Sequence, residues 1–382
     1  MAGKLAPINT DVLDWAVRES GLSRRELAAS AKIPEERLHA ILVDHEQPMT
    51  GEFKSLAKAL ARPTAFFFLP KVPRSDKSRA SFRYPPGRSG EGALHFAERS
   101  ALRNALRWQK VLSWVRKESD IGHADLPRVP EDLSPQAVAS HLSTWLHWDT
   151  EFQKKATSPS AVFRMLRERV EEHGVAVMQL SLGNDSCRGF SLPHIDSPVI
   201  AVNSAYNPPA RIFTLLHELT HLLRGDSALC GDPRNDTVER FCESSAAIFL
   251  VPADDLREYV AKRLRVRRVD DVDQVRRVAN YYKISLRAAA IRLRQVGLAD
   301  SLLYDKVNRI GEFGSSGFNP NVERQTTPVI RVRELGSEIP RLLFAARDTG
   351  AMSETEVRRH LNVNGSQLAE IRERISRPQV EA

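Results

Sequence analysis

His217, Glu218 and His221 are the residues of this sequence whose types and spacing could perform chemistry. They lie in the apolar stretch 211–223, which predicts a buried helix. Two histidines four residues apart share one helix face, so their imidazoles can take two corners of a tetrahedral zinc site. A glutamate next to the first histidine can exchange protons without binding the metal. The alternative is a pair of core histidines bonded to backbone, with Glu218 exposed. That alternative leaves three polar residues on an apolar helix in need of partners.

A third ligand must come from another element, and the segment 236–252 offers two glutamates. The segment predicts a second helix that ends at a proline, with Glu239 and Glu243 one turn apart. Glu239 follows His221 by 18 residues, about the spacing at which thermolysin-like sites supply their glutamate. Glu239 could also form a helix cap, and Glu243 could be a solvated helix position. Spacing alone leaves the choice between them open.

Three short β-prone runs, 174–178, 188–192 and 198–203, come directly before the histidine-bearing helix. Most other segments have helical periodicity, so we expect a mainly α fold with a small β-sheet, of the α+β class. An extended peptide could bind along the edge of such a sheet as an added strand. The candidate substrate strand consists of Arg188, Gly189, Phe190, Ser191 and Leu192.

Residues 9–70 predict a compact helical unit. Ser23 and Glu26 have the spacing of a capping box, and helix, short turn and helix follow one another as in a helix-turn-helix. The unit resembles the XRE-type repressor-like DNA-binding domain, on Gly21-Leu22-Ser23, Glu26-Leu27-Ala28 and Leu56-Ala57. The presumed recognition helix begins with two glutamates at 35 and 36, which oppose contact with phosphates. DNA binding and protein docking therefore both stay open for this unit.

The two helices that could hold zinc resemble the active-site helices of the ImmA/IrrE family of metallopeptidases. The resemblance covers about residues 175–300; its main motifs lie in these two helices, and the segment 284–298 also resembles the family. In the first helix it is carried by Arg211, Phe213, Thr214, Leu215, His217, Glu218, Leu219, His221, Leu222 and Leu223; in the second by Glu239, Cys242, Ala246, Ala247 and 249–252. It implies that Glu239 is the zinc ligand and that Glu243, in place of a common asparagine, is its neighbour. It also implies site-specific cleavage of a helix-turn-helix repressor inside the cell.

The expected mechanism is hydrolysis of a peptide bond. Zinc held by His217, His221 and Glu239 lowers the pKa of a bound water, and Glu218 acts first as general base and then as general acid. Manganese and iron are compatible with the same ligands.

Composition and length are those of a soluble protein with several domains. The chain has 382 residues, 42% of them hydrophobic, and a net charge of +8. Three widely separated cysteines indicate reduced thiols, and no segment has the length of a membrane span, so we expect a cytoplasmic protein without membrane contact. The predicted domains are 1–70 (helix-turn-helix), 71–92 (linker), 93–300 (metallopeptidase, with a helical lead-in at 93–172 and a core at 173–300) and 301–382 (helical, C-terminal).

A second hypothesis is a DNA-binding transcriptional regulator or antitoxin-like module with a structural or sensory zinc site. The positive charge and the N-terminal unit favour it. Glu218 disfavours it, because a structural zinc site has no use for a general base.

Overall fold

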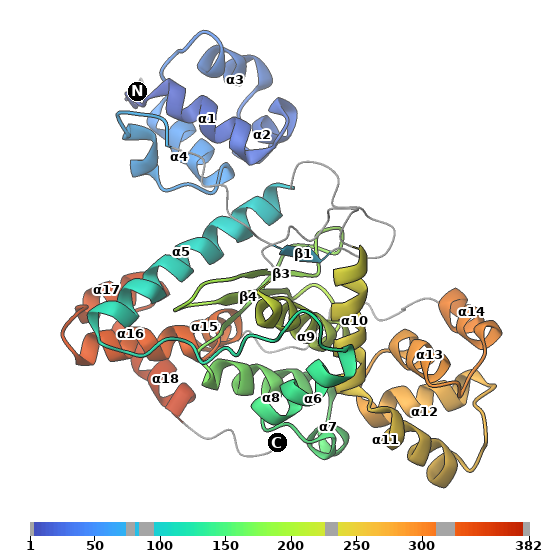
Figure 1. Ribbon diagram of the computed structural model, residues 1–382. Helices are drawn as coiled ribbons and strands as arrows, with labels where there is room; N and C mark the ends of the chain where they lie inside the picture. Colours follow the sequence, from blue (N-terminus) through green and yellow to red (C-terminus); the bar gives the residue numbers. More distant parts are fainter. Residues whose placement is uncertain (1–3, 74–80, 84–94, 226–235, 311–324, 377–382) are drawn as a thin grey trace. The chain divides into compact units, whose positions relative to one another are not determined.

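The computed structural model describes residues 4–73, 81–83, 95–225, 236–310 and 325–376 (Figure 1). The chain divides into two compact units. The first comprises residues 1–78 and 91–104, and the second comprises 79–90 and 105–382. The predicted domain boundaries remain predictions, including the separation of 301–382 from the metallopeptidase domain.

The first unit is a compact group of helices, as the sequence predicts. It contains α1 (Thr10–Ser20), α2 (Arg24–Ala31), α3 (Glu35–Leu42), α4 (Thr50–Ala59) and the 3-10 helix η1 (Thr64–Phe68). Ser23 and Glu26 form the capping box of α2, and Lys32 in the left-handed region (φ 55°) turns the chain toward α3. Pro34 precedes α3 as its cap instead of opening it. A short turn joins α2 to α3, and the assignment of the pair as a helix-turn-helix stays a prediction.

A four-stranded mixed sheet lies in the second unit, in the order β1-β3-β4-β2. The strands are β1 (Ser81–Arg83), β2 (Ala176–Leu180), β3 (Gly189–Leu192) and β4 (Val199–Asn203). β4 runs parallel to β2 and antiparallel to β3, and β3 pairs antiparallel with β1. Every residue of β3 and β4 is buried, which is expected of strands covered on both faces.

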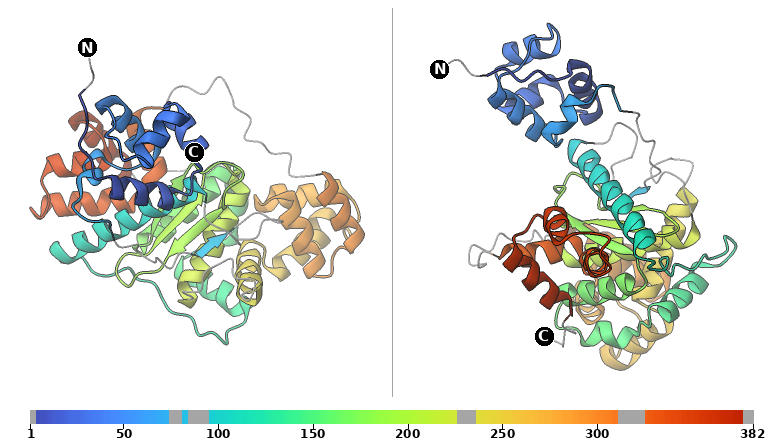
Figure 2. Two further views of the ribbon diagram at one scale, coloured as in Figure 1. Left: turned by 90° about the horizontal axis from the view of Figure 1, so that it is seen from above. Right: turned by 90° about the vertical axis from the view of Figure 1, so that its left-hand side faces the viewer.

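Helices surround this sheet. They are α5 (Phe96–Glu118, which begins in the first unit), α6 (Pro135–Trp145), α7 (Thr150–Lys155), α8 (Pro159–Glu172), α9 (Pro208–Arg224), α10 (Asp236–Leu250), α11 (Ala253–Tyr259), the π-helix η3 (Val260–Leu264), α12 (Val272–Tyr282), α13 (Leu286–Gln295), α14 (Ser301–Ile310), α15 (Thr327–Leu335), α16 (Glu338–Asp348), α17 (Glu354–Leu361) and α18 (Gly365–Ser376). The groups α11–α14 and α15–α18 lie on opposite sides of the sheet (Figures 1 and 2).

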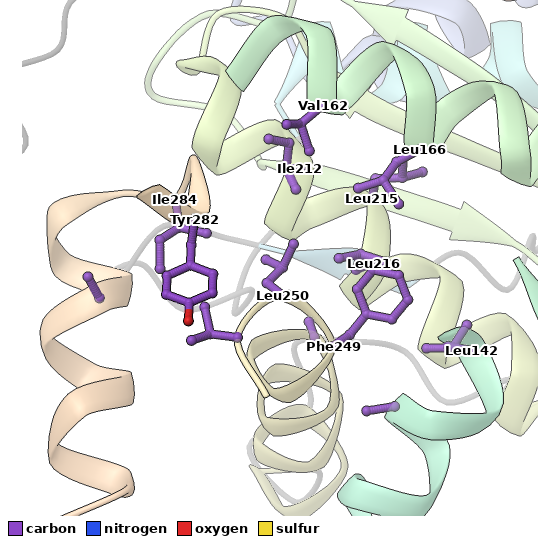
Figure 3. Close-up of a cluster of buried hydrophobic side chains, with 14 of the residues drawn as sticks. Leu142, Val162, Leu166, Ile212, Leu215, Leu216, Phe249, Leu250, Tyr282 and Ile284 are labelled. Atoms are coloured by element: carbon purple, nitrogen blue, oxygen red, sulfur yellow. The ribbon is translucent and has the colours of Figure 1, made fainter. Parts of the chain in front are cut away.

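The main core packs around α9. Apolar side chains of α6, α8, α9, α10, α12 and the turn after α12 meet there (Figure 3); they include Leu142, Val162, Leu166, Ile212, Leu215, Leu216, Phe249, Leu250, Tyr282 and Ile284. Full burial of one such side chain contributes about 1.5–3 kcal/mol. The helix that carries the histidine pair is therefore held from several directions.

Buried charges join the C-terminal helices to the rest of the second unit. Arg116 Nη2 contacts Glu338 Oε1 at 2.6 Å, and the exposed fractions of the two side chains are 6% and 1%. Glu171 Oε2 accepts hydrogen bonds from the backbone N–H and the hydroxyl of Ser337, at 2.9 and 2.7 Å. α16 is thus fixed by ionic contacts that its own sequence does not reveal.

The predicted fold class is confirmed: the second unit has a small sheet, and helices make up most of the chain. The three predicted strands are present as β2, β3 and β4, whereas β1 was not predicted. None of the helices in the described ranges combines the length and the apolarity that crossing a membrane requires.

Candidate metal centre

α9 places the histidine pair in the middle of the core. The side chain of Asn207 accepts a hydrogen bond from the N–H of Ala210 at the start of the helix, and Gly225 ends it in the left-handed region (φ 66°). His217 and Glu218 are 0% exposed and His221 is 2% exposed. As the four-residue spacing predicts, both imidazoles lie on one face of α9.

α10 packs against α9 and brings Glu239 to the two imidazoles. Its carboxylate oxygens lie 3.3 Å from His217 Nε2 and 3.3 Å from His221 Nε2. The two Nε2 atoms are 3.1 Å apart. All three potential ligand atoms lie within 4.8 Å of one another. Glu243 is exposed and does not belong to this cluster, so the packing of α10 distinguishes the two glutamates where spacing could not.

The chemistry of this donor set fits a metal ion. Two imidazole nitrogens directed at each other, with a carboxylate bridging them, place three electron-pair donors around one point. Two imidazoles and one carboxylate are the three protein ligands of a catalytic zinc site that keeps a fourth position open. The side chain of Glu239 is 28% exposed, so the cluster is accessible from the side of α10.

Glu218 lies beside the cluster without belonging to it. Ser191 Oγ donates a hydrogen bond of 2.9 Å to Glu218 Oε2, and both residues are buried. This contact joins β3 to α9. It gives Ser191 a positioning role that the sequence did not suggest, because a serine in a β-prone run carries no signal of its own.

Gly189 allows β3 to lie this close to α9. A Cβ atom at this position would stand 2.5 Å from Thr214 Cγ2 and 2.8 Å from the carbonyl oxygen of Ala201. Neither distance is tolerable for a real side chain, so the strand can approach the helix only with glycine here. The close approach brings Ser191, two residues further along β3, to Glu218.

Electrostatics favour an ionised carboxylate at Glu239. Burial opposes its ionisation, but hydrogen bonds from His217 and His221 outweigh burial and hold the pKa of Glu239 well below its usual range. Cys242 stands one turn from Glu239 on α10, and its thiol contacts His221. Burial raises the pKa of this thiol, although His221 partly offsets the effect.

The candidate substrate strand, residues 188–192, does not lie at the edge of the described sheet, and its contact with substrate stays a prediction. β1 pairs with β3 along its whole length, with Ser81, Phe82 and Arg83 opposite Ser191, Phe190 and Gly189. The outer strand on this side of the sheet is therefore β1, which belongs to the segment that was expected to be a linker, and β2 is the outer strand on the other side. The physical reason is that backbone pairing with an existing strand can order a segment whose own composition does not favour a strand.

The comparison with protein families agrees with this geometry. Residues 170–294 match the family model Peptidase_M78, which is described as the IrrE N-terminal-like domain. This segment is similar to the IrrE N-terminal-like domain. No curated protein and no solved structure matches the chain.

The IrrE N-terminal-like domain contains every residue of the metal cluster. It begins at the end of α8 and closes near the end of α13, so it includes β2, β3, β4 and both ligand-bearing helices. The match supports a metallopeptidase of the ImmA/IrrE type. The helical first unit and residues 295–382 lie outside the match, and the resemblance of the first unit to XRE repressors stays a prediction.

Replacing Ser191 with Ala should slow peptide cleavage by the IrrE-like domain about tenfold and leave metal content unchanged. A hydrogen bond to a charged group is worth about 1.5–3 kcal/mol, and without it Glu218 is held less well. Cleavage rate, KM and zinc content of the full chain would be measured. Ser197→Ala is the matched control, because Ser197 is also buried and its hydroxyl has no hydrogen-bond partner in the described structure. Equal rates for the two variants would contradict the positioning role.

Proposed function

We propose that this protein is a zinc-dependent endopeptidase that makes site-specific cuts in a regulatory protein. The observation that carries the proposal is the convergence of His217, His221 and Glu239 beside Glu218. A structural zinc site usually has four protein ligands, whereas the described residues supply three here, with a further carboxylate beside them.

Each residue of the site has its own role in the proposed hydrolysis. Zinc held by the three ligands would act as a Lewis acid on the peptide carbonyl and acidify a water molecule. Glu218 takes the proton from the attacking water and passes it to the leaving amine. Ser191 holds the Glu218 carboxylate in place from β3. The apolar core around α9 keeps the carboxylate in a low-dielectric setting, where these interactions are stronger than in water.

The substrate class and the cellular site are further parts of the proposal. We propose a helix-turn-helix repressor as the protein that is cut, on the resemblance to the ImmA/IrrE family. We also propose that the enzyme acts in the cytoplasm. Cys187 and Cys242 are buried free thiols, which suits a reducing compartment.

Metal analysis of the purified chain tests the proposal. We expect about one zinc per chain, in line with a single three-ligand site. Loss of a residue that only hydrogen-bonds to a metal ligand weakens metal binding by about 10- to 100-fold. His217→Ala and Glu239→Ala each remove a ligand itself, so each should weaken zinc binding by more than that. Glu243→Ala is the matched control and should keep its zinc. A chain that takes up no zinc, or loses it only with Glu243, would refute the proposed site.

A second candidate function is DNA binding by the first unit. It is supported by two short successive helices, α2 and α3, which a short turn joins as in a helix-turn-helix. Glu35 and Glu36, both exposed at the start of α3, count against it. A gel-shift experiment with DNA from upstream of the protein's own gene decides between them. Salt-sensitive, sequence-selective binding would support the regulator hypothesis, and its absence would favour a docking role.

A further inference from the structure

A hollow lies between α13 and the two helices that carry the metal cluster, α9 and α10. We call it the basic pocket. Its volume is about 330 Å³, at the lower end of the roughly 300–1,000 Å³ of ligand pockets, so it suits a short peptide segment. Its apolar part includes Phe213, Ala247, Ala288 and Ile291. Such a lining favours a large apolar side chain.

Both ligand-bearing helices continue into the walls of the basic pocket. Phe213 precedes His217 by four residues on α9, and Glu243 follows Glu239 by four residues on α10. Four residues of a helix rise about 6 Å, and one residue of an extended peptide spans about 3.3–3.6 Å. The basic pocket therefore lies about two substrate residues from the metal cluster.

The charges around the basic pocket are unbalanced. Its lining contains four arginines, at 188, 240, 287 and 292, against the single carboxylate of Glu243. Arg292 is engaged in the fold, since its Nε donates to the carbonyl of Val251 at 2.8 Å. A cluster of guanidinium groups over an apolar lining attracts carboxylates, which arginine binds with two parallel hydrogen bonds.

Two of these arginines have no carboxylate partner of their own. Within the part of the chain that the structure describes, neither Arg188 nor Arg287 takes part in an ion pair. Both are half-buried. Arg188 lies over the ring of Tyr206, 5.2 Å from its centroid, and its Nε is buried without a hydrogen-bond partner. Leaving partly desolvated cations unpaired costs free energy that an incoming carboxylate would recover.

We propose that the basic pocket selects the substrate: it binds an apolar side chain within about two residues of the cut bond, next to an acidic residue. The proposal rests on the proposed peptidase function. It deepens that function by naming Arg188 and Arg287 as residues that determine specificity. The strand that approaches Glu218 thus also supplies, just before its start, one contact of the basic pocket.

Binding to an inactive chain tests the preference without relying on cleavage. The full chain carrying Glu218→Gln would be titrated with two pools of fluorescent ten-residue peptides, each with a central leucine. One pool has Asp or Glu beside the leucine, and the other has Lys or Arg. We expect the acidic pool to bind at least about tenfold more tightly, as two charge-assisted contacts allow. Arg287→Glu in the same background should abolish the preference. Arg294→Ala, on the exposed face of the same helix, should retain it.

The outcomes separate this inference from the peptidase function. Equal binding of the two pools, or an Arg287→Glu variant that keeps the preference, would overturn the inference. Displacement of the acidic pool by short single-stranded DNA would assign the pocket to nucleic acid and would also overturn it. Digestion of a degenerate peptide pool by the zinc-loaded wild-type chain tests the function itself. Cleavage with no acidic residue enriched near the cut refutes the inference and leaves the peptidase function standing. No cleavage beside a clear binding preference refutes the peptidase function, and with it the role of the pocket in selecting a substrate, but leaves the preference of the pocket for acidic peptides standing.

Discussion

The chain carrying Glu218→Gln should keep its zinc and lose peptide cleavage by about a hundred- to ten-thousandfold, the usual contribution of general acid–base catalysis. Glu218 stands next to His217 in the sequence but outside the cluster of three ligand atoms. Glutamine has nearly the same shape and can still accept the hydrogen bond from Ser191. It cannot take a proton from water. The loss should therefore fall on the chemical step, with the metal site intact.

Two measurements on one preparation check this prediction. Zinc content establishes that the site is intact, and mass spectrometry of a digested degenerate peptide pool gives the rate. Glu258→Gln serves as control, because Glu258 is an exposed carboxylate on α11 that pairs with Lys262. If Glu218→Gln cleaves at the wild-type rate, Glu218 is not the base. If it loses zinc, Glu218 has a role in holding the metal.

The second large effect concerns stability: Glu338→Ala should lower the free energy of unfolding of the second unit by about 3–5 kcal/mol. Arg116 would then be left buried with its charge uncompensated. Burial raises the pKa of Glu338, and Arg341 and Arg116 offset only part of that effect. Burial of this ion pair therefore costs free energy. Removing only one partner costs more, because the remaining charge stays buried without its partner. Arg116 also donates to the carbonyls of Gly122 and Gly174, so it cannot simply move into water.

Urea unfolding of the full chain measures the effect. Glu370→Ala, which breaks the more exposed pair with Arg374 on α18, should change stability by less than about 1 kcal/mol. The double variant Arg116→Met with Glu338→Leu should regain part of the loss, because it removes both buried charges together. A loss for Glu338→Ala as small as that of the control would show that this ion pair does not hold α16.

Local patterns of the sequence were enough to predict many elements. The helix of the histidine pair, the helix that ends before Pro252 and the three strands β2, β3 and β4 are present within a few residues of their expected positions. The capping box of Ser23 and Glu26 is also formed. These patterns involve residues only a few positions apart, so they can be recognised directly in the sequence. β1 is the counterexample, since its strand conformation depends on pairing with β3, more than a hundred residues away.

The candidate site likewise has some features that local sequence determines and others that depend on tertiary packing. The sequence by itself determined that His217 and His221 share a helix face and that Glu218 stands beside them, because helical geometry fixes residues one turn apart. Spacing left the choice between Glu239 and Glu243 open and only the family resemblance favoured Glu239; the tertiary structure brings Glu239 to the cluster, because the choice depends on how α10 packs on α9. The contact of Ser191 with Glu218 and the pairing of Arg116 with Glu338 were likewise decided there. The physical reason is that burial and packing between distant segments select such partners, and no local pattern records which segments will meet.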